Sequence, residues 1–333
     1  MRQRATVREL AAETGLSIAT ISRVLNDRSN VAPRTREVVL QAVDRLGRGT
    51  GRARREDGGA ICVRCPYPLD DYFGPMVTSI VETVELHGMT AILDAGAARP
   101  GAGLTHLPQT AGARGAVLIL PPEPGERLVE LRDSGFPFVV LDPRTSPPRD
   151  IVAVSAAHVT GARSLMSHLV ELGHRRVGII AGPREWLVTD NRMTGYVAAL
   201  ADVGVLPAPE LLRFVEPTVQ EGYAAAAQLL DVPERPTALV GFNDKIAVGA
   251  LRAARERGLR VPEDISVAGF DDTDISQATE PMLTTVRQPL AELGRMAVTM
   301  LIRVMSRHRL DARHVELATD LVVRGSTGRA PAS

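Results

Sequence analysis

The chain has 333 residues with 39 basic and 39 acidic side chains, so it is neutral overall, and 44% of its residues are hydrophobic. This length is too great for one small domain and suits two or three. The chain has no long apolar run of transmembrane type, and its start, MRQRATVREL, lacks the apolar core of a signal peptide. These features argue against membrane and exported proteins, and we expect a cytoplasmic protein.

Residues 6–26 read as two short helices joined by a tight turn. Gly15 stands at the turn, where a left-handed backbone is sterically easy, and Ser17 is suited to cap the second helix. Apolar residues recur at helical spacing on one face, namely Val7, Leu10, Ala11, Ile18, Ile21, Val24 and Leu25. The outward face of the second helix has small residues and one guanidinium, and it carries Ala19, Ser22, Arg23 and Asn26. Such a surface fits a DNA major groove.

A third helix completes a small all-α head. Pro33 is suited to its first turn, and its apolar stripe is Val38, Val39, Ala42, Val43 and Leu46. Residues 1–55 hold twelve arginines and five acidic residues, a net charge of +7, which leaves −7 on the rest of the chain. A basic head on an acidic body indicates a phosphate-binding module. The alternative, a helical hairpin in a larger bundle, gives no reason for this charge difference.

Two segments, TVRELAAETGLSIATISRVLN and VAPRTREVVLQAVDRLG, resemble the DNA-binding head of the lactose-repressor and galactose-repressor family of bacterial regulators. The match runs in register through two helices, the turn and the third helix. The resemblance implies that Arg23 reads guanine through O6 and N7, while Ile18 and Ala19 offer apolar contacts to base edges. The full implied DNA-binding set is Thr6, Ser17, Ile18, Ala19, Thr20, Ser22, Arg23 and Asn26.

A Gly- and Arg-rich linker, residues 48–59, joins this head, residues 1–47, to the rest of the chain. Its composition is that of a flexible tether. In the resembled family, a hinge helix here wedges a leucine into the minor groove. Ala53 and Arg54 match the start of that motif, but Glu56 stands where the leucine is expected, and the linker is shorter. Because a wedge needs an apolar side chain, both a tether and an atypical hinge stay open.

From residue 60 onward, short apolar runs alternate with helical patterns. The runs are AICVRC, TAILDAG, GAVLILP and FPFVVLD in a first series, and RRVGIIAGP, LLRFVE, TALVGF and DISVAGFDD in a second. Such alternation predicts parallel sheets, and two series predict two doubly wound α/β subdomains within residues 60–333. We assign residues 60–154 and 286–312 to the N-subdomain, and residues 155–285 and 313–328 to the C-subdomain.

Two other kinds of site are disfavoured in this core. Cys62 and Cys65 are spaced like a redox or metal pair, but alternation along AICVRC sends them to opposite faces of a strand. We interpret them as buried structural thiols. Gly101 to Gly103 only approximates a dinucleotide-binding fingerprint, since it follows no clean strand and lacks a third glycine. We therefore expect neither a metal nor a cofactor.

Polar residues follow several predicted strands, at the edge where open parallel sheets bind ligands. This part of the chain resembles the effector-binding core of the same family, which has a periplasmic-binding-protein-like fold. The matching segments are GHRRVGIIAGP, Arg192-x-x-Gly195, FNDKIAVGALRAARERGLRVPEDISVAGFDD and PMLTTVRQPLAELG. The resemblance implies an effector site made of Asp70, Tyr72, Phe73, Trp186, Arg192, Asn243 and Asp271. Trp186 is equally suited to the core.

Other polar residues near these strand ends receive structural interpretations. Asp244 is suited to cap the helix that ends before Gly258, and Asp272 to a solvated turn. Where the family commonly has Asp-Asn, this chain has Ala157 and His158. The resemblance therefore implies a lost carboxylate and an effector that is smaller, less hydroxylated or not a sugar. We expect His158 at the surface, with a replacement ligand contact as the alternative.

These features predict a homodimeric transcriptional regulator, most simply a repressor, that reads a near-palindromic double-stranded DNA operator. A sugar or related metabolite is the expected effector, and residues 75–88 are expected in the dimer interface. A solute-binding protein with the same core is the alternative, although it has no use for a basic head. An enzyme is not expected, because the chain has no Gly-x-Ser-x-Gly elbow, metal-ligand spacing or phosphate loop.

Overall fold

The computed structural model describes residues 14–17, 20, 24, 35, 38–39, 42, 59–95 and 104–331. The chain divides into two units, residues 1–59 and residues 60–333, and each is described by itself. Within the described ranges, no helix is both long and apolar enough to cross a membrane.

The described residues of the first unit fit a small helical head. Gly15 has a φ of +66°, as the predicted turn requires. The Thr20 amide donates to Ser17 Oγ at 3.1 Å, so Ser17 caps the second helix as predicted. Val24, Val39 and Ala42 are buried. The expected burial of Val38 is wrong, since it is 38% exposed, about 100° around the helix from Val39.

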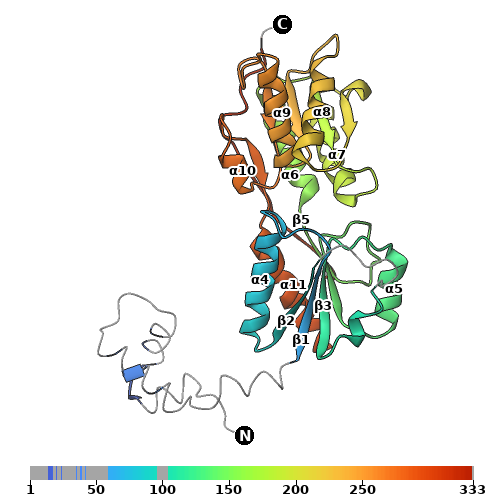
Figure 1. Cartoon of the computed structure of the whole chain (residues 1–333), viewed down its shortest axis with the longest axis vertical. Coiled ribbons are helices and arrows are strands. Elements are labelled where there is room, and N and C mark those ends of the chain that lie inside the picture. The colour runs from blue at the N-terminus through green and yellow to red at the C-terminus, as the bar shows by residue number, and fades with distance from the viewer. Residues whose placement is uncertain are drawn as a thin grey trace. The chain divides into compact units, whose positions relative to one another are not determined.

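The second unit contains two α/β lobes, and the first lobe holds a six-stranded parallel sheet (Figure 1). The strand order is β11-β5-β4-β3-β1-β2. The strands are β1 (Ala60–Cys65), β2 (Thr90–Ala95), β3 (Ala113–Ile119), β4 (Phe138–Leu141), β5 (Ala153–Ala156) and β11 (His314–Leu317). Every strand contact in this sheet is parallel, as the alternation of the sequence predicts.

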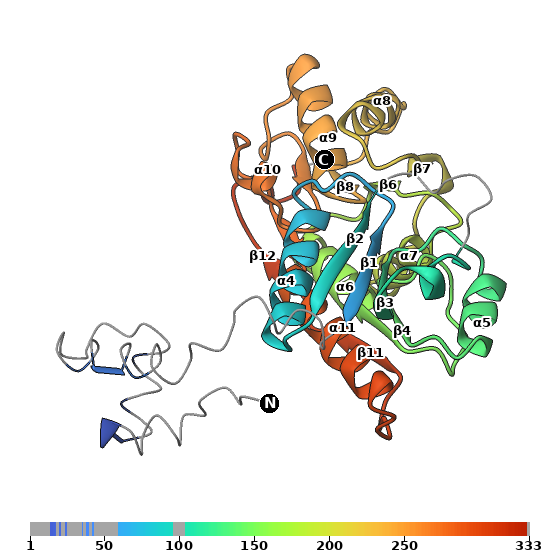
Figure 2. The same cartoon turned by 60° about the horizontal axis from the view of Figure 1, so that its bottom comes forward.

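Helices cover both faces of this first sheet. On one face, α4 (Phe73–Leu86) and α11 (Leu290–Met305) pack on apolar side chains that include Cys65. On the other, α5 (Gly125–Asp133) and η1 (Leu107–Gln109) pack around Cys62. Figure 2 shows α4 and α5 on opposite sides of β1 and β3. The two free, buried cysteines thus face opposite sides of β1, which confirms their interpretation as structural thiols.

The second lobe holds a four-stranded parallel sheet in the order β7-β6-β8-β9. Its strands are β6 (Val177–Ala181), β7 (Leu212–Phe214), β8 (Ala238–Gly241) and β9 (Ser266–Ala268). One face is covered by α6 (His158–Glu171) and α7 (Leu187–Ala201), and the other by α8 (Val219–Leu230) and α9 (Asp244–Glu256). Smaller elements are η2 (Pro209–Leu211), α10 (Asp274–Gln277) and the antiparallel pair β10 (Thr285–Arg287) and β12 (Asp320–Val322).

The chain passes between the lobes three times, after β5, after β10 and after β11. The expected assignment of residues 313–328 to the C-subdomain is therefore wrong for β11, which pairs with β5 in the first sheet. Likewise, β5 extends to Ala156, two residues past the expected boundary at 154. β11 escaped prediction because it is a short edge strand, in which exposed and half-buried residues alternate.

Glycines allow close helix crossings in the second lobe. A Cβ on Gly195 of α7 would lie 2.3 Å from the Val159 carbonyl oxygen and 2.7 Å from the Arg163 amide nitrogen, both in α6. We expect Gly195→Ala to lower the free energy of unfolding by about 3 kcal/mol, because the helix backbones must separate. Urea denaturation followed by circular dichroism measures this change.

Gly125→Ala, at the start of α5, is the matched control. A Cβ there meets no atom within 4 Å, so the free energy of unfolding is expected to stay nearly unchanged. Equal stability of the two variants would contradict the close packing of α6 on α7.

Candidate functional site

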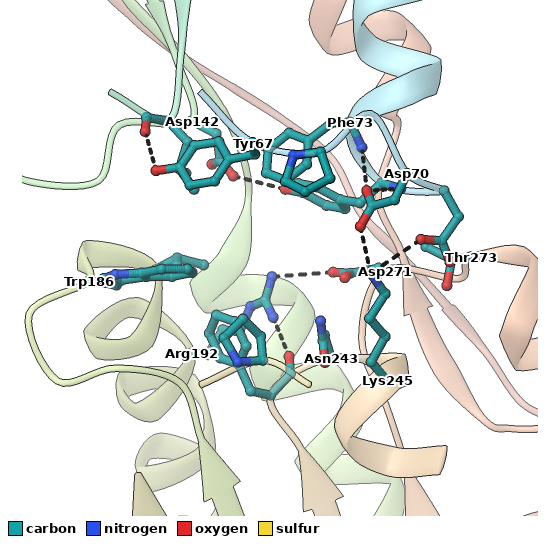
Figure 3. A pocket seen from close by; sticks show the side chains of 17 residues that line it. Tyr67, Asp70, Phe73, Asp142, Trp186, Arg192, Asn243, Lys245, Asp271 and Thr273 are labelled. Atoms are coloured by element: carbon teal, nitrogen blue, oxygen red, sulfur yellow. Dashed lines mark hydrogen bonds and ion pairs between the residues drawn. The ribbon is translucent and has the colours of Figure 1, made fainter. Parts of the chain in front are cut away.

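A cavity of about 150 Å³ lies between the two lobes, at the carboxyl ends of their strands. Figure 3 shows its two walls, with Asp142, Tyr67 and Phe73 from the first lobe facing Trp186 and Arg192 from the second. The structure brings together all seven effector-site residues expected from the sequence, since the cavity is lined by Asp70, Tyr72, Phe73, Trp186, Arg192, Asn243 and Asp271. Further polar lining comes from Tyr67, Asp71, Asp142, Lys245 and Thr273.

Arg192 is a buried cation in the second-lobe wall of the cavity. It projects from α7, and its guanidinium lies 3.7 Å from the centre of the Phe270 ring and 4.5 Å from that of Phe242. Nη1 donates to the Phe242 carbonyl oxygen, and Nη2 lies 3.5 Å from Asp271 Oδ1. Two rings and two acceptors therefore fix the guanidinium as a rigid hydrogen-bond donor.

Asp271 is the carboxylate that faces Arg192. It follows β9 with a φ of +111°, an uncommon backbone conformation for a residue with a side chain, and such strain occurs at functional sites. Gln288 Nε2 donates to its Oδ1 at 2.7 Å. Burial raises the pKa of Asp271 to about 8, and the charge of Asp244 adds to this rise while Arg192 opposes it.

This raised pKa predicts a pH-dependent stability. A carboxyl group whose pKa rises on folding binds its proton more tightly in the folded state, so its contribution to stability falls as pH rises toward the folded pKa. Asparagine does not titrate. We therefore expect the free energy of unfolding of Asp271→Asn, relative to the unmodified protein, to increase from pH 5 to pH 8. Urea denaturation across this range measures the difference, and a constant difference would contradict the assignment.

Asp142 is a second buried carboxylate at the cavity, on the first-lobe side. It directly follows β4 with a φ of +52°. Tyr72 Oη donates to its Oδ2 at 3.0 Å, and His158 Nε2 lies 2.9 Å from its Oδ1. His158 and Tyr72 oppose the cost of burying the carboxylate and hold the pKa of Asp142 below its ordinary value. A fixed acceptor therefore faces the cavity.

Neither expectation for His158 is correct. It is 3% exposed, so it is not a surface residue, and it is not among the residues that line the cavity. Its ring instead reaches from the start of α6 to Asp142. Asp142 was not among the residues predicted to form the effector site. Its position at the end of the apolar run FPFVVLD, where a strand ends, is the signal that could have identified it.

The expected roles of Asp244 and Asp272 are also wrong. Asn243 caps α9, since its Oδ1 accepts from the Ile246 amide at 3.0 Å. Asp244 is buried and accepts hydrogen bonds from Thr273 and Thr285. The Asp272 side chain is only 3% exposed, and both Arg287 and Arg324 pair with it. The N-cap of α9 is therefore the neighbouring Asn243, and the turn at Asp272 is shielded from solvent by two arginines from elsewhere in the chain.

Aromatic side chains give the cavity apolar surfaces. Tyr67 and Phe73 stack with ring centres 4.8 Å apart and an angle of 7° between their planes. On the other wall, Trp186 meets Phe242 at 6.1 Å, nearly edge to face, and Arg144 lies 5.1 Å from the Trp186 ring centre. Among the described residues, Trp186 Nε1 is buried without a hydrogen-bond partner. The cavity thus joins flat apolar surfaces to fixed polar groups.

Lys245 forms an ion pair across the cleft. Its Nζ lies 2.5 Å from Asp70 Oδ2 and 3.6 Å from Asp71 Oδ1, so the start of α9 is joined to the loop before α4. Asp70 Oδ1 also accepts from the amides of Tyr72 and Phe73. Lys245 and Asp70 are each about one-third exposed, so the pair contributes about 1 kcal/mol or less. Such a contact can hold the lobes together yet open easily.

The chain matches known families at both ends. Residues 6–47 match "Bacterial regulatory proteins, lacI family", and residues 166–327 match "Periplasmic binding protein-like domain". It is 32% identical over 333 residues to the HTH-type transcriptional repressor CytR of Escherichia coli (strain K12), covering 98% of this chain and 97% of CytR. It is 34% identical over 344 residues to the HTH-type transcriptional regulator MalR of Streptomyces coelicolor, covering 97% and 96%.

Solved structures agree with these sequence matches. The structure of the transcriptional regulator CelR in complex with cellobiose aligns with a TM-score of 0.74 and 29% identity, over 97% of this chain and 100% of that one. The match at residues 6–47 argues against the solute-binding alternative, because it covers the DNA-binding head. The predicted fold, a helix-turn-helix head followed by a periplasmic-binding-protein-like core, is confirmed. This chain therefore belongs to the lacI family and is a DNA-binding transcriptional regulator.

Proposed function

We propose that this regulator is a homodimeric repressor whose two heads read a near-palindromic operator, and that a small polar effector binds in the cavity between the lobes. The observation that carries the effector site is the convergence of seven expected residues from both lobes on one cavity. Of the implied DNA-binding set, Ser17 and Thr20 are described, and the other six residues lie outside the described ranges, as does the linker, residues 48–59.

The cavity favours an uncharged ligand with several hydroxyl groups and one flat apolar face. Asp142 and Asp271 supply acceptors from opposite lobes, Arg192 supplies a donor, and the stacked rings of Tyr67 and Phe73 supply an apolar surface. This combination suits a carbohydrate, and the solved complex of CelR with cellobiose supports that class. Asp142 and Asp271 are held in place by hydrogen bonds from neighbouring side chains. We therefore propose that they bind the ligand and do not catalyse a reaction of it.

Effector entry requires the lobes to separate. The cavity volume of about 150 Å³ is smaller than the 300–1,000 Å³ of common ligand sites. Opening breaks the contact between Lys245 and Asp70, and a ligand that bridges both lobes then sets a new angle between them. In a dimer assembled partly through α4, such a change alters the spacing of the two heads, with a coupling free energy of about 1–3 kcal/mol.

A thermal-shift screen of the full chain tests this proposal with cellobiose, other mono- and disaccharides, and nucleosides as probes. We expect one class of probe to raise the melting temperature, because a ligand at 100 times its Kd stabilises the folded state by about 2.7 kcal/mol. Asp142→Asn is expected to weaken this rise. An equal rise in the Asp142→Asn protein and the unmodified protein would place the ligand elsewhere. Sedimentation velocity tests the dimer.

A further inference from the structure

The last turn of α11 and the loop after it carry a set of arginines that no carboxylate of the described residues pairs with. Residues 303–314, RVMSRHRLDARH, contain four arginines and one acidic residue, Asp311. Within the described part of the chain, these four form no ion pair. Arg303 and Arg313 donate to the carbonyl oxygens of Arg309 and Asp150. Apart from half-buried Arg303 they are exposed. We call this set the basic rim: Arg303, Arg307, Arg309 and Arg313.

The basic rim lies at the edge of the first sheet where the chain enters from the linker. Arg313 immediately precedes β11, and Ala60 begins β1. Because all six strands are parallel, their amino ends share one edge, and β1 is four strands from β11, about 19 Å at usual strand spacing. The exposed Arg114 of β3 extends the rim toward Ala60, whose amide donates to the Gly112 carbonyl oxygen at 2.7 Å. Figure 1 places this edge opposite the second lobe.

The basic rim is distinctive because its arginines, unpaired among the described residues, cluster within residues 303–314. Other exposed arginines, such as Arg127 and Arg252, have carboxylate partners on their own surface. At the rim edge, Arg132 already pairs with Asp133 and Asp150, so these acids do not neutralise the rim. Clustered like charges repel one another in the free protein. An external anion with regularly spaced charges relieves that repulsion.

We propose that the basic rim binds backbone phosphates of duplex DNA beside the site held by the head. The inference rests on the DNA-binding function and adds a second contact surface, on the core itself. The linker, residues 48–59, spans at most about 43 Å when fully extended, so the end of the head at residue 47 stays within about that distance of Ala60. Glu56 stands where a wedging leucine is expected. Phosphate contacts from the core strengthen binding without a wedge and without base specificity.

Salt dependence tests the rim directly. The full chain carrying Arg307→Gln, Arg309→Gln and Arg313→Gln is titrated against a random-sequence 40-base-pair duplex by fluorescence anisotropy at several NaCl concentrations. A random sequence suffices because phosphate contacts dominate non-specific binding. Each lost contact reduces the slope of log K against log[NaCl] by about 0.9, so we expect a reduction of up to about 2.7.

The matched control removes three arginines from the second lobe, Arg184→Gln, Arg235→Gln and Arg255→Gln, with the same change in charge. Its slope is expected to equal that of the unmodified protein. An unchanged slope in the rim variant, or equal reductions in both variants, overturns the inference. If the triple rim variant does not fold, the three single variants carry the test, each with an expected reduction of about 0.9. Absence of DNA binding by the unmodified chain instead overturns the regulatory function.

Discussion

Replacing Arg192 by alanine is expected to abolish the thermal shift by effector and to lower the free energy of unfolding by about 3–5 kcal/mol. The guanidinium is buried between Phe242 and Phe270, and it is the cation that faces the Asp271 carboxylate. Its removal takes a packed side chain out from between two rings and leaves Asp271 without its cationic partner. The second cost applies above about pH 8, where Asp271 is ionised, and it exceeds the loss of an exposed pair. Urea denaturation and the ligand screen measure the two effects.

A double variant separates the charge effect from the loss of packing. Asp271→Asn added to Arg192→Ala removes the titrating group, so above about pH 8 we expect it to restore part of the lost stability without restoring the ligand response. Arg184→Ala is the matched control, because that guanidinium also lies over a ring, Phe214 at 3.6 Å, but is exposed. Strictly additive effects of the two substitutions would show that the pair is not coupled.

Arg23→Ala is expected to weaken binding to the preferred operator about 5- to 150-fold and to relax base preference at one position of each half-site. The reason is the loss of the bidentate contact to guanine that the family resemblance implies for Arg23, which is worth about 1–3 kcal/mol of discrimination. Selection from randomised duplexes by the full chain identifies the preferred sequence, and anisotropy titrations then give the affinities of both proteins.

Arg23→Lys is the informative companion. Lysine keeps the positive charge but lacks the planar fork of donors, so we expect the salt dependence to survive while guanine preference declines. Unchanged affinity and base preference in the alanine variant would mean that Arg23 does not read DNA.

Local patterns predicted the fold well. Alternation of apolar runs with helical patterns indicated parallel sheets in two lobes, and polar residues at strand ends indicated the cavity. The reason is that a strand buried on both faces, such as β1, consists mainly of consecutive apolar residues, which the sequence shows directly. The cap of α9 was misplaced by one residue, because Asn243 and Asp244 are both good capping residues and the sequence alone does not choose between them.

Contacts between distant residues were beyond prediction. Lys245 and Asp70 are 175 residues apart, and His158 reaches Asp142 from a different element. No spacing rule in the sequence links such pairs, because their contact depends on how the two lobes pack against each other. β11 is a similar case, because its place in the first sheet depends on the partner strand β5 rather than on its own weak pattern.

The composition of the first lobe also fixes when it can fold during synthesis. Its core includes side chains of α11, and its outer strand β11 ends only at Leu317. The ribosome, at about 5–20 residues per second, has then completed nearly the whole chain. The second-lobe helices α6 to α9 leave the ribosome earlier and pack largely on one another and on their own sheet. The second lobe also needs the last residues, because Leu321 of β12 packs against its core and Ser326 bonds with Val267 of β9. An unfinished chain therefore cannot complete the packing of either lobe.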